Sequence, residues 1–195
     1  PCSWVRPSGA SAAAAQPLLS RAIPRTGERL PVVGLGTAII FDIGDDAGKR
    51  AERQAVIRAM IEGGGRMIDT APSYGTAERV VGDLLAASGM REKIFLATKL
   101  RVAGRDDSIA EMRQSLQRLR TGKVDLMQLH NVNDAKTDLR VLREWREQGF
   151  TRYIGITHFQ AGANERVAEV LRREKPEFVQ INYSLAERSP EERLL

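Results

Sequence analysis

Residues 94–99 read IFLATK, a short run of apolar and β-branched residues that ends on a lysine. Residues 124–130, VDLMQLH, repeat this pattern further along the chain and end on a histidine. The stretch between these two runs spaces its apolar residues as one face of a helix does. A strand, a helix and a second strand in this order are typical of a parallel βαβ unit.

The same unit recurs on both sides of these two runs. Six short apolar runs start at residues 32, 66, 94, 124, 153 and 178, at intervals of 25 to 34 residues. Helical patterns lie between them. The first of these, residues 47–62, places its small and apolar residues on one face: Ala55, Val56, Ala59 and Met60. Ser108-Ile109-Ala110-Glu111 has the form of a capping box, which predicts that the third helix begins at Ser108.

Two architectures use this unit, the open doubly wound sheet and the closed (β/α)8 barrel. A dinucleotide-binding doubly wound sheet needs G-x-G-x-x-G after its first strand, and Gly34 and Gly36 supply only two of the three glycines. A barrel gathers the C-terminal ends of all its strands on one face, whereas an open sheet gathers its ligand groups at one switch point. Here five consecutive strands end in polar side chains, namely Asp69, Lys99, His130, Thr157 with His158, and Gln180 with Asn182.

The polar strand ends therefore favour the barrel. We predict an α/β fold of the (β/α)8 TIM-barrel type, with only the first six βα units present in residues 30–195. A complete barrel of this type takes about 250 residues.

The composition is that of a globular protein. The chain has 195 residues, of which 42% are hydrophobic and 28% charged, with a net charge of +5. One cysteine, Cys2, excludes a disulfide framework, and with only two histidines we expect no metal centre. The arginines stand beside acidic residues, as in residues 143–147, so we expect solvated helix faces and no nucleic-acid partner. No run approaches the roughly 18 apolar residues of a membrane span, so we expect no membrane partner.

Residues 1–29 differ from the rest of the chain and are predicted to form a flexible leader. The segment is rich in Ala, Ser, Pro and Gly and has no sustained hydrophobic period. Residues 13–15, Ala-Ala-Ala, resemble the cleavage region of a secretory signal, although the charged and apolar regions that precede such a site are absent. The leader is thus either a signal-peptide remnant or a flexible extension. A third alternative is that its apolar residues, such as Ile23, pack on the domain.

Four polar residues near the strand ends form a chemical set. Asp69, Tyr74, Lys99 and His130 offer a carboxylate, a phenol, an ammonium and an imidazole, which the predicted barrel brings to one rim. The carboxylate allows a buried lysine to stay charged, and a nearby cation favours the phenolate form of a tyrosine. A tyrosine in this setting can pass its proton to a carbonyl oxygen. The set therefore favours carbonyl reduction, with a nicotinamide cofactor as the source of hydride.

The motifs that carry these residues resemble those of the aldo-keto reductase family. The resemblance extends from about residue 30 to residue 195, and the four residues of the set occur in the family's order. The matching segments are residues 35–37 (LGT), 65–75 (GRMIDTAPSYG), 97–99 (ATK), 125–130 (DLMQLH), 153–159 (YIGITHF) and 179–183 (VQINY).

This resemblance implies that the chain reduces an aldehyde or ketone to an alcohol. Tyr74 would be the general acid, Lys99 would assist it while being held by Asp69, and His130 would orient the carbonyl group. The cofactor would be NADP(H) and the partner a small-molecule carbonyl substrate. The residues that would contact the cofactor are Gly36, Thr37, Asp69, Thr157, His158 and Gln180. The family usually has asparagine at the position of His158, and an imidazole cannot both donate and accept in the compact geometry of an amide.

Other functions stay open on this scaffold. One is a non-catalytic NADP(H)-binding or regulatory remnant, because the six units lack the region in which the family holds most of the dinucleotide. Another is a barrel isomerase or aldolase that forms a Schiff base on Lys99, which pairing with Asp69 disfavours. The supply of nicotinamide favours the cytoplasm, whereas the Ala-rich leader also fits export to the periplasm. The oligomeric state is not indicated by any pattern.

Overall fold

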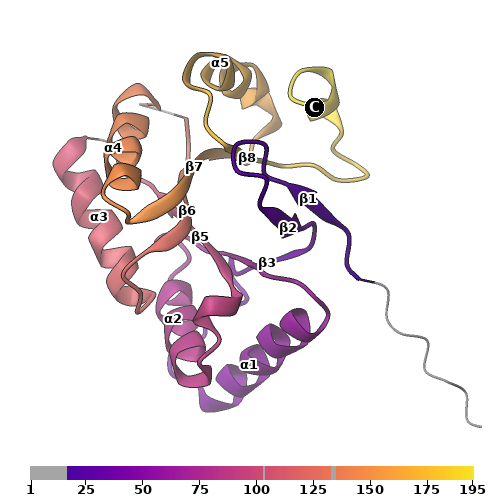
Figure 1. Ribbon diagram of the computed structural model, residues 1–195, viewed down its shortest axis with the longest axis vertical. Helices are drawn as coiled ribbons and strands as arrows, with labels where there is room; N and C mark the ends of the chain where they lie inside the picture. Colours follow the sequence, from indigo (N-terminus) through magenta and orange to yellow (C-terminus); the bar gives the residue numbers. More distant parts are fainter. Residues whose placement is uncertain (1–16, 103, 133–134) are drawn as a thin grey trace, which may run out of the picture.

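The computed structural model describes residues 17–102, 104–132 and 135–195, which form a curved parallel sheet with helices on its outer side (Figure 1). The strands are β1 (Ser20–Ala22), β2 (Arg29–Pro31), β3 (Gly34–Gly36), β4 (Met67–Asp69), β5 (Phe95–Leu100), β6 (Val124–Leu129), β7 (Thr151–His158) and β8 (Phe178–Ile181). The α-helices are α1 (Ala47–Glu62), α2 (Ala77–Ser88), α3 (Arg105–Arg118), α4 (Ala135–Glu147) and α5 (Asn164–Glu174). Short 3-10 turns lie at Arg91–Lys93, Ala161–Ala163 and Ser189–Glu192.

The main sheet has the topology of a barrel wall. Its six strands run parallel in the order β3-β4-β5-β6-β7-β8, so each strand pairs with the one before it in the chain. One α-helix lies in each connection, from α1 between β3 and β4 to α5 between β7 and β8. The strand order does not reverse, as it does in a doubly wound sheet. The predicted fold class, a (β/α)8 barrel represented by six units, is confirmed.

The two faces of the sheet bury different side chains, because successive residues of a strand point to opposite faces. Phe95, Ala97 and Leu126 pack together inside the curve of the sheet. Leu96 and Met127 belong instead to the larger core between the sheet and the helices. Every residue of β5 and β6 is buried, as expected for a parallel sheet that is covered on both faces.

A hairpin of β1 and β2 lies across the open side of the curved sheet, between β3 and β8 (Figure 1). Ile23 in its turn is 5% exposed and packs with Phe95 and Tyr153. Glu28 accepts a hydrogen bond from the hydroxyl of Tyr153 at 2.7 Å and forms an ion pair with Arg152. These contacts attach the hairpin to the inner layer of the sheet.

The hairpin corrects the prediction of a flexible leader over residues 1–29. Residues 20–29 are ordered, because burial of Ile23 and the contacts of Glu28 hold them on the domain. The alternative in which Ile23 packs on the domain is therefore the one observed. Residues 1–16, which include the signal-like Ala-Ala-Ala, lie outside the described residues.

Two predictions about the helices were wrong in detail. Helix α1 has the predicted bounds, but it buries Ile57 and leaves Val56 43% exposed. Helix α1 packs on β3, at the edge of the sheet, and laterally on α2. Only a narrow face of the helix is therefore buried. Helix α3 begins at Arg105, and the Ser108 hydroxyl donates to the carbonyl of Gly104 instead of capping the helix. Glu111, expected as the second half of the capping box, accepts from backbone N–H groups of the preceding loop.

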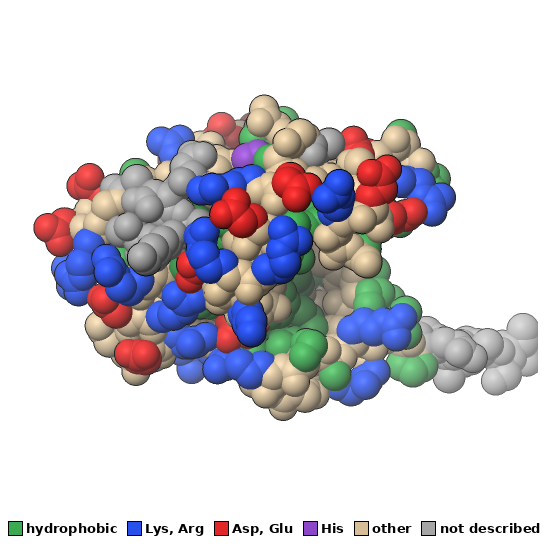
Figure 2. Space-filling model, turned by 90° about the horizontal axis from the view of Figure 1, so that it is seen from above, with side chains coloured by type: hydrophobic (Ala, Val, Ile, Leu, Met, Phe, Trp, Pro, Cys, Tyr) green, Lys and Arg blue, Asp and Glu red, His purple; other side chains and the backbone are tan. Residues whose placement is uncertain are grey.

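Positive and negative side chains are interspersed over the face shown in Figure 2. Charged side chains of the described residues form ion pairs on the helix faces, as Arg166 and Glu169 of α5 do at 3.3 Å. Among the described residues, no helix is long and apolar enough to cross a membrane. The described part of the chain also contains no group of three or more His, Cys, Asp or Glu side chains that could hold a metal ion.

Candidate active site at the C-terminal ends of the strands

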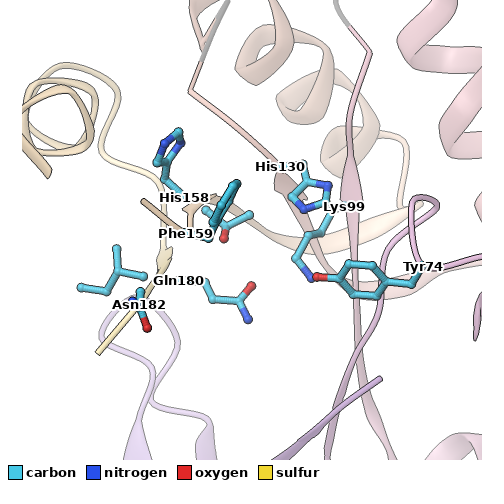
Figure 3. A pocket seen from close by; sticks show the side chains of 9 residues that line it. Tyr74, Lys99, His130, His158, Phe159, Gln180 and Asn182 are labelled. Atoms are coloured by element: carbon cyan, nitrogen blue, oxygen red, sulfur yellow. The ribbon is translucent and has the colours of Figure 1, made fainter. Parts of the chain in front are cut away.

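The polar strand ends surround a pocket of about 400 Å³. In Figure 3, Tyr74, Lys99 and His130 lie together on one side of this pocket, and His158, Gln180 and Asn182 lie on the other. The full lining consists of Tyr74, Lys99, His130, Thr157, His158, Phe159, Gln180, Ile181 and Asn182. The barrel topology thus brings together residues of three strands, β5, β7 and β8, and of the segments that follow β4, β6, β7 and β8.

Lys99 is a buried cation with a defined counter-charge. Its side chain is 1% exposed, and its Nζ atom donates to Asp69 Oδ2 at 2.6 Å and to the carbonyl oxygen of Thr70 at 2.9 Å. The pairing keeps an ammonium in a site where an isolated charge would be very costly. Asp69 ends β4 and Lys99 lies on the neighbouring strand β5, so strand pairing alone brings the two groups together.

Tyr74 lies beside this pair, in the loop between β4 and α2. The Lys99 Nζ atom is 5.0 Å from the centroid of the Tyr74 ring, and the hydroxyl end of the ring points toward it (Figure 3). The next residue, Gly75, has a φ of +58°, and a Cβ there would lie 2.3 Å from the carboxylate of Asp42. That carboxylate accepts hydrogen bonds from the backbone N–H and the hydroxyl of Thr76. The close approach at Gly75 fixes the turn that presents Tyr74.

His130 follows β6 and completes the group. Its ring lies edge-on to Tyr74, with the two centroids 6.0 Å apart and an interplanar angle of 86°. The pKa of His130 is lowered from its ordinary 6.5 to about 4, mainly because the ring is partly buried and also because the Lys99 cation is near. The charge of Asp69 opposes this shift and that of Arg101 adds to it. The imidazole is therefore neutral near pH 7, and it can donate or accept one hydrogen bond at each nitrogen.

A ring of hydrogen bonds joins the two sides of the pocket through Gln128, which was not among the predicted site residues. The Nε2 atom of Gln128 is 3.1 Å from Asp69 Oδ1 and 3.3 Å from Gln180 Oε1. Gln180 Nε2 donates in turn to Asp69 Oδ2 at 3.3 Å. Gln128 is 1% exposed. It lies two residues before His130, and the two-residue period of a strand that points His130 inward also points Gln128 inward. The two-residue period of the strand was thus the sequence signal that could have indicated Gln128 as a site residue.

The residues predicted to contact a cofactor fall into two groups. Thr157, His158 and Gln180 line the pocket, and Asp69 reaches it through Lys99. Gly36 and Thr37 do not line it. The Thr37 hydroxyl donates to the carbonyl oxygen of Asp69 at 3.0 Å, so this side chain is used within the fold.

The site has the means to donate a proton to a bound oxygen atom. A phenol faces the pocket with an ammonium and a neutral imidazole beside it. The ammonium would stabilise the phenolate that remains after proton transfer. Two acceptors, one a carboxylate, already engage Lys99 Nζ, an arrangement that favours the protonated amine over a nucleophilic one.

The fold and the site together define a protein of the α/β barrel class, with a polar pocket that contains Tyr74, Lys99 and His130 at the C-terminal ends of its strands. The family model of the aldo/keto reductase family matches residues 32–195. The chain belongs to the aldo/keto reductase family, which confirms the resemblance seen in the motifs.

Known relatives support this assignment. The aldo-keto reductase YhdN of Bacillus subtilis is 32% identical over 190 residues, which are 89% of this chain and 56% of the relative. The methylglyoxal reductase YeaE of Escherichia coli is 45% identical over 105 residues, which are 52% of this chain and 35% of the relative. The chain therefore spans about half the length of the curated relatives that it matches.

Solved structures agree with these relatives. An aldo-keto reductase of Klebsiella pneumoniae in complex with NADPH has a TM-score of 0.74 and 28% identity, over 85% of this chain and 58% of that one. A thermostable aldo-keto reductase in complex with the inhibitor epalrestat has a TM-score of 0.77 and 29% identity, over 90% of this chain and 66% of that one.

Proposed function

We propose that this chain carries the catalytic site of an NADP(H)-dependent reductase that converts an aldehyde or ketone to an alcohol. The observation that carries the proposal is the arrangement of Tyr74, Lys99 and His130 on one wall of a pocket of about 400 Å³. Membership of the aldo/keto reductase family supports it, as does the NADPH complex of the Klebsiella pneumoniae structure. The Escherichia coli relative is named as a methylglyoxal reductase, which fits a small carbonyl compound as substrate.

In this mechanism Tyr74 donates the proton that the carbonyl oxygen needs as it becomes an alcohol oxygen. The Lys99 ammonium, 5.0 Å from the Tyr74 ring, stabilises the phenolate that this donation leaves. Asp69 holds Lys99 in place at 2.6 Å. His130, uncharged near pH 7, orients the carbonyl oxygen by a hydrogen bond that does not compete with Tyr74 for the role of acid.

The opposite wall of the pocket fits the carboxamide end of a nicotinamide, which supplies the hydride when bound. The Nδ1 atom of His158 is buried and has no hydrogen-bond partner among the described residues. A buried polar atom without a partner is uncommon, and a carboxamide offers both a donor and an acceptor to satisfy it. Thr157 and Gln180 lie on the same wall and would bind the same group.

The test is binding of NADPH to the 195-residue chain, followed by reduction of methylglyoxal with wild type and Tyr74→Phe. We expect NADPH to quench the fluorescence of buried Trp145 with a Kd below about 10 μM, close to −7 kcal/mol, in both proteins. Reduction should be lost only in Tyr74→Phe. If Tyr74→Phe reduces methylglyoxal as fast as wild type does, Tyr74 is not the general acid. Binding of NADPH with no reduction by wild type would favour the non-catalytic alternative.

A further inference from the structure

Arg101 directly follows the last residue of β5, two positions after Lys99, at the end of the sheet where the candidate active site lies. The ladder between β5 and β6 pairs Lys99 with Gln128 and Leu100 with Leu129. The backbone N–H of His130 then donates to the carbonyl of Leu100 at 2.8 Å. The next position along this register places Arg101 opposite His130.

If the alternation of β5 continues by one residue, Arg101 lies on the same side of the sheet as Lys99. Two residues along a strand advance about 7 Å, so Arg101 lies about that far outward from Lys99, toward the mouth of the pocket. The charge of Arg101 contributes to the lowered pKa of His130, which agrees with a guanidinium near that ring.

Within the described part of the chain, no carboxylate forms an ion pair with the side chain of Arg101. The nearby acid Glu111 is already engaged. Its Oε2 atom accepts the backbone N–H groups of Arg101 and Val102 at 2.5 and 3.2 Å. The other cation of the pocket, Lys99, is neutralised by Asp69. Arg101 is thus a cation at this end of the sheet that can bind an anion.

We propose that Arg101 binds a carboxylate of the substrate, so that the substrates are carbonyl compounds that also carry an acidic group. This inference rests on the proposed function, because Tyr74 and His130 define where the carbonyl lies. An arginine guanidinium matches a carboxylate with two parallel hydrogen bonds, which gives both affinity and orientation. The backbone contacts with Glu111 fix the segment that carries Arg101 and so reduce the cost of ordering it.

The experiment compares two test compounds of the same shape that differ in one charge. 4-Carboxybenzaldehyde has the acidic group across an aromatic ring from the aldehyde, and 4-formylbenzamide has a neutral amide there. Binding of each to the 195-residue chain is measured by isothermal titration calorimetry, so the readout does not require turnover. The proteins are wild type, Arg101→Gln, Arg101→Lys and the control Arg113→Gln, which removes an equal charge from an exposed position on α3.

We expect wild type and Arg113→Gln to bind the carboxylate at least tenfold more tightly than the amide. Arg101→Gln should bind the two compounds equally, and Arg101→Lys should retain part of the preference. Equal binding by wild type, binding of neither compound, or the same loss in Arg113→Gln would overturn the proposal. If Arg101→Gln instead weakens NADPH binding and leaves the carboxylate preference intact, Arg101 serves the cofactor and the proposal is also wrong. A clear preference for the carboxylate with no reduction of either aldehyde would contradict the proposed function alone.

Discussion

Replacing Asp69 with asparagine removes the charge that compensates buried Lys99 while almost preserving the shape of the side chain. At the observed 2.6 Å between Lys99 Nζ and Asp69 Oδ2, with an effective dielectric constant of about 20, the Coulomb attraction is about 6 kcal/mol. The asparagine oxygen and the Thr70 carbonyl can still accept hydrogen bonds from the ammonium, which offsets part of this loss. We therefore expect Asp69→Asn to lower the free energy of unfolding by about 3–5 kcal/mol.

The assay is urea unfolding at pH 7, followed by far-ultraviolet circular dichroism and by the fluorescence of Trp145, which is 4% exposed. A double-mutant cycle with Lys99→Met measures the coupling energy between Asp69 and Lys99 apart from the contacts that each makes with other residues. Because the double variant leaves no unpaired charge, it should be more stable than the sum of the single losses predicts, with a coupling energy of at least about 2 kcal/mol. The exposed pair Arg166 and Glu169 serves as a control, with an expected coupling below about 0.5 kcal/mol. A similarly small coupling between Asp69 and Lys99 would refute the reasoning.

Three further predictions concern single positions. In nuclear magnetic resonance titrations His130 should show a pKa of about 4. Because this pKa is below the ordinary value of 6.5, the contribution of His130 to stability is present above pH 6.5 and is lost as the pH falls toward 4. The variant His130→Gln should lack this part of the pH dependence of stability. A His130 signal that titrates between pH 6 and 7 would contradict this. Gly82→Ala should lower the free energy of unfolding by about 1–3 kcal/mol, because the Cβ of the new alanine would lie 2.3 Å from the Arg118 carbonyl oxygen. An unchanged urea midpoint would show that α2 and α3 can separate freely. Gln128→Leu should lower the free energy of unfolding by about 1.5–3 kcal/mol in the same assay, since Asp69 Oδ1 loses its amide donor. An unchanged free energy of unfolding would mean that water replaces this donor.

The repeating pattern of the sequence was sufficient to predict the architecture. Six apolar runs at intervals of 25 to 34 residues predicted the six parallel strands of the sheet. The reason is local, because strand period, helix period and turn residues act over a few neighbouring residues. The polar residues at the strand ends were equally accessible. In a parallel barrel every strand ends on the same face, so Lys99, His130 and Thr157 had to meet once the topology was known.

Tertiary contacts decided what the pattern left open. Residues 20–31 have weak local signals, and their hairpin forms because Ile23 fills the inner layer beside Phe95 and Tyr153. Whether Gln128 is a solvated amide or part of the site depends on Asp69, 59 positions away in the chain.

The same applies to Glu111, which has the sequence context of a helix cap but instead accepts N–H groups of the preceding loop. Local periodicity therefore determined the order of the elements and the set of residues at the rim. Burial and hydrogen-bond partners between distant segments determined which of those residues act together, because desolvation and hydrogen bonding depend on every group nearby and not on neighbours in the chain.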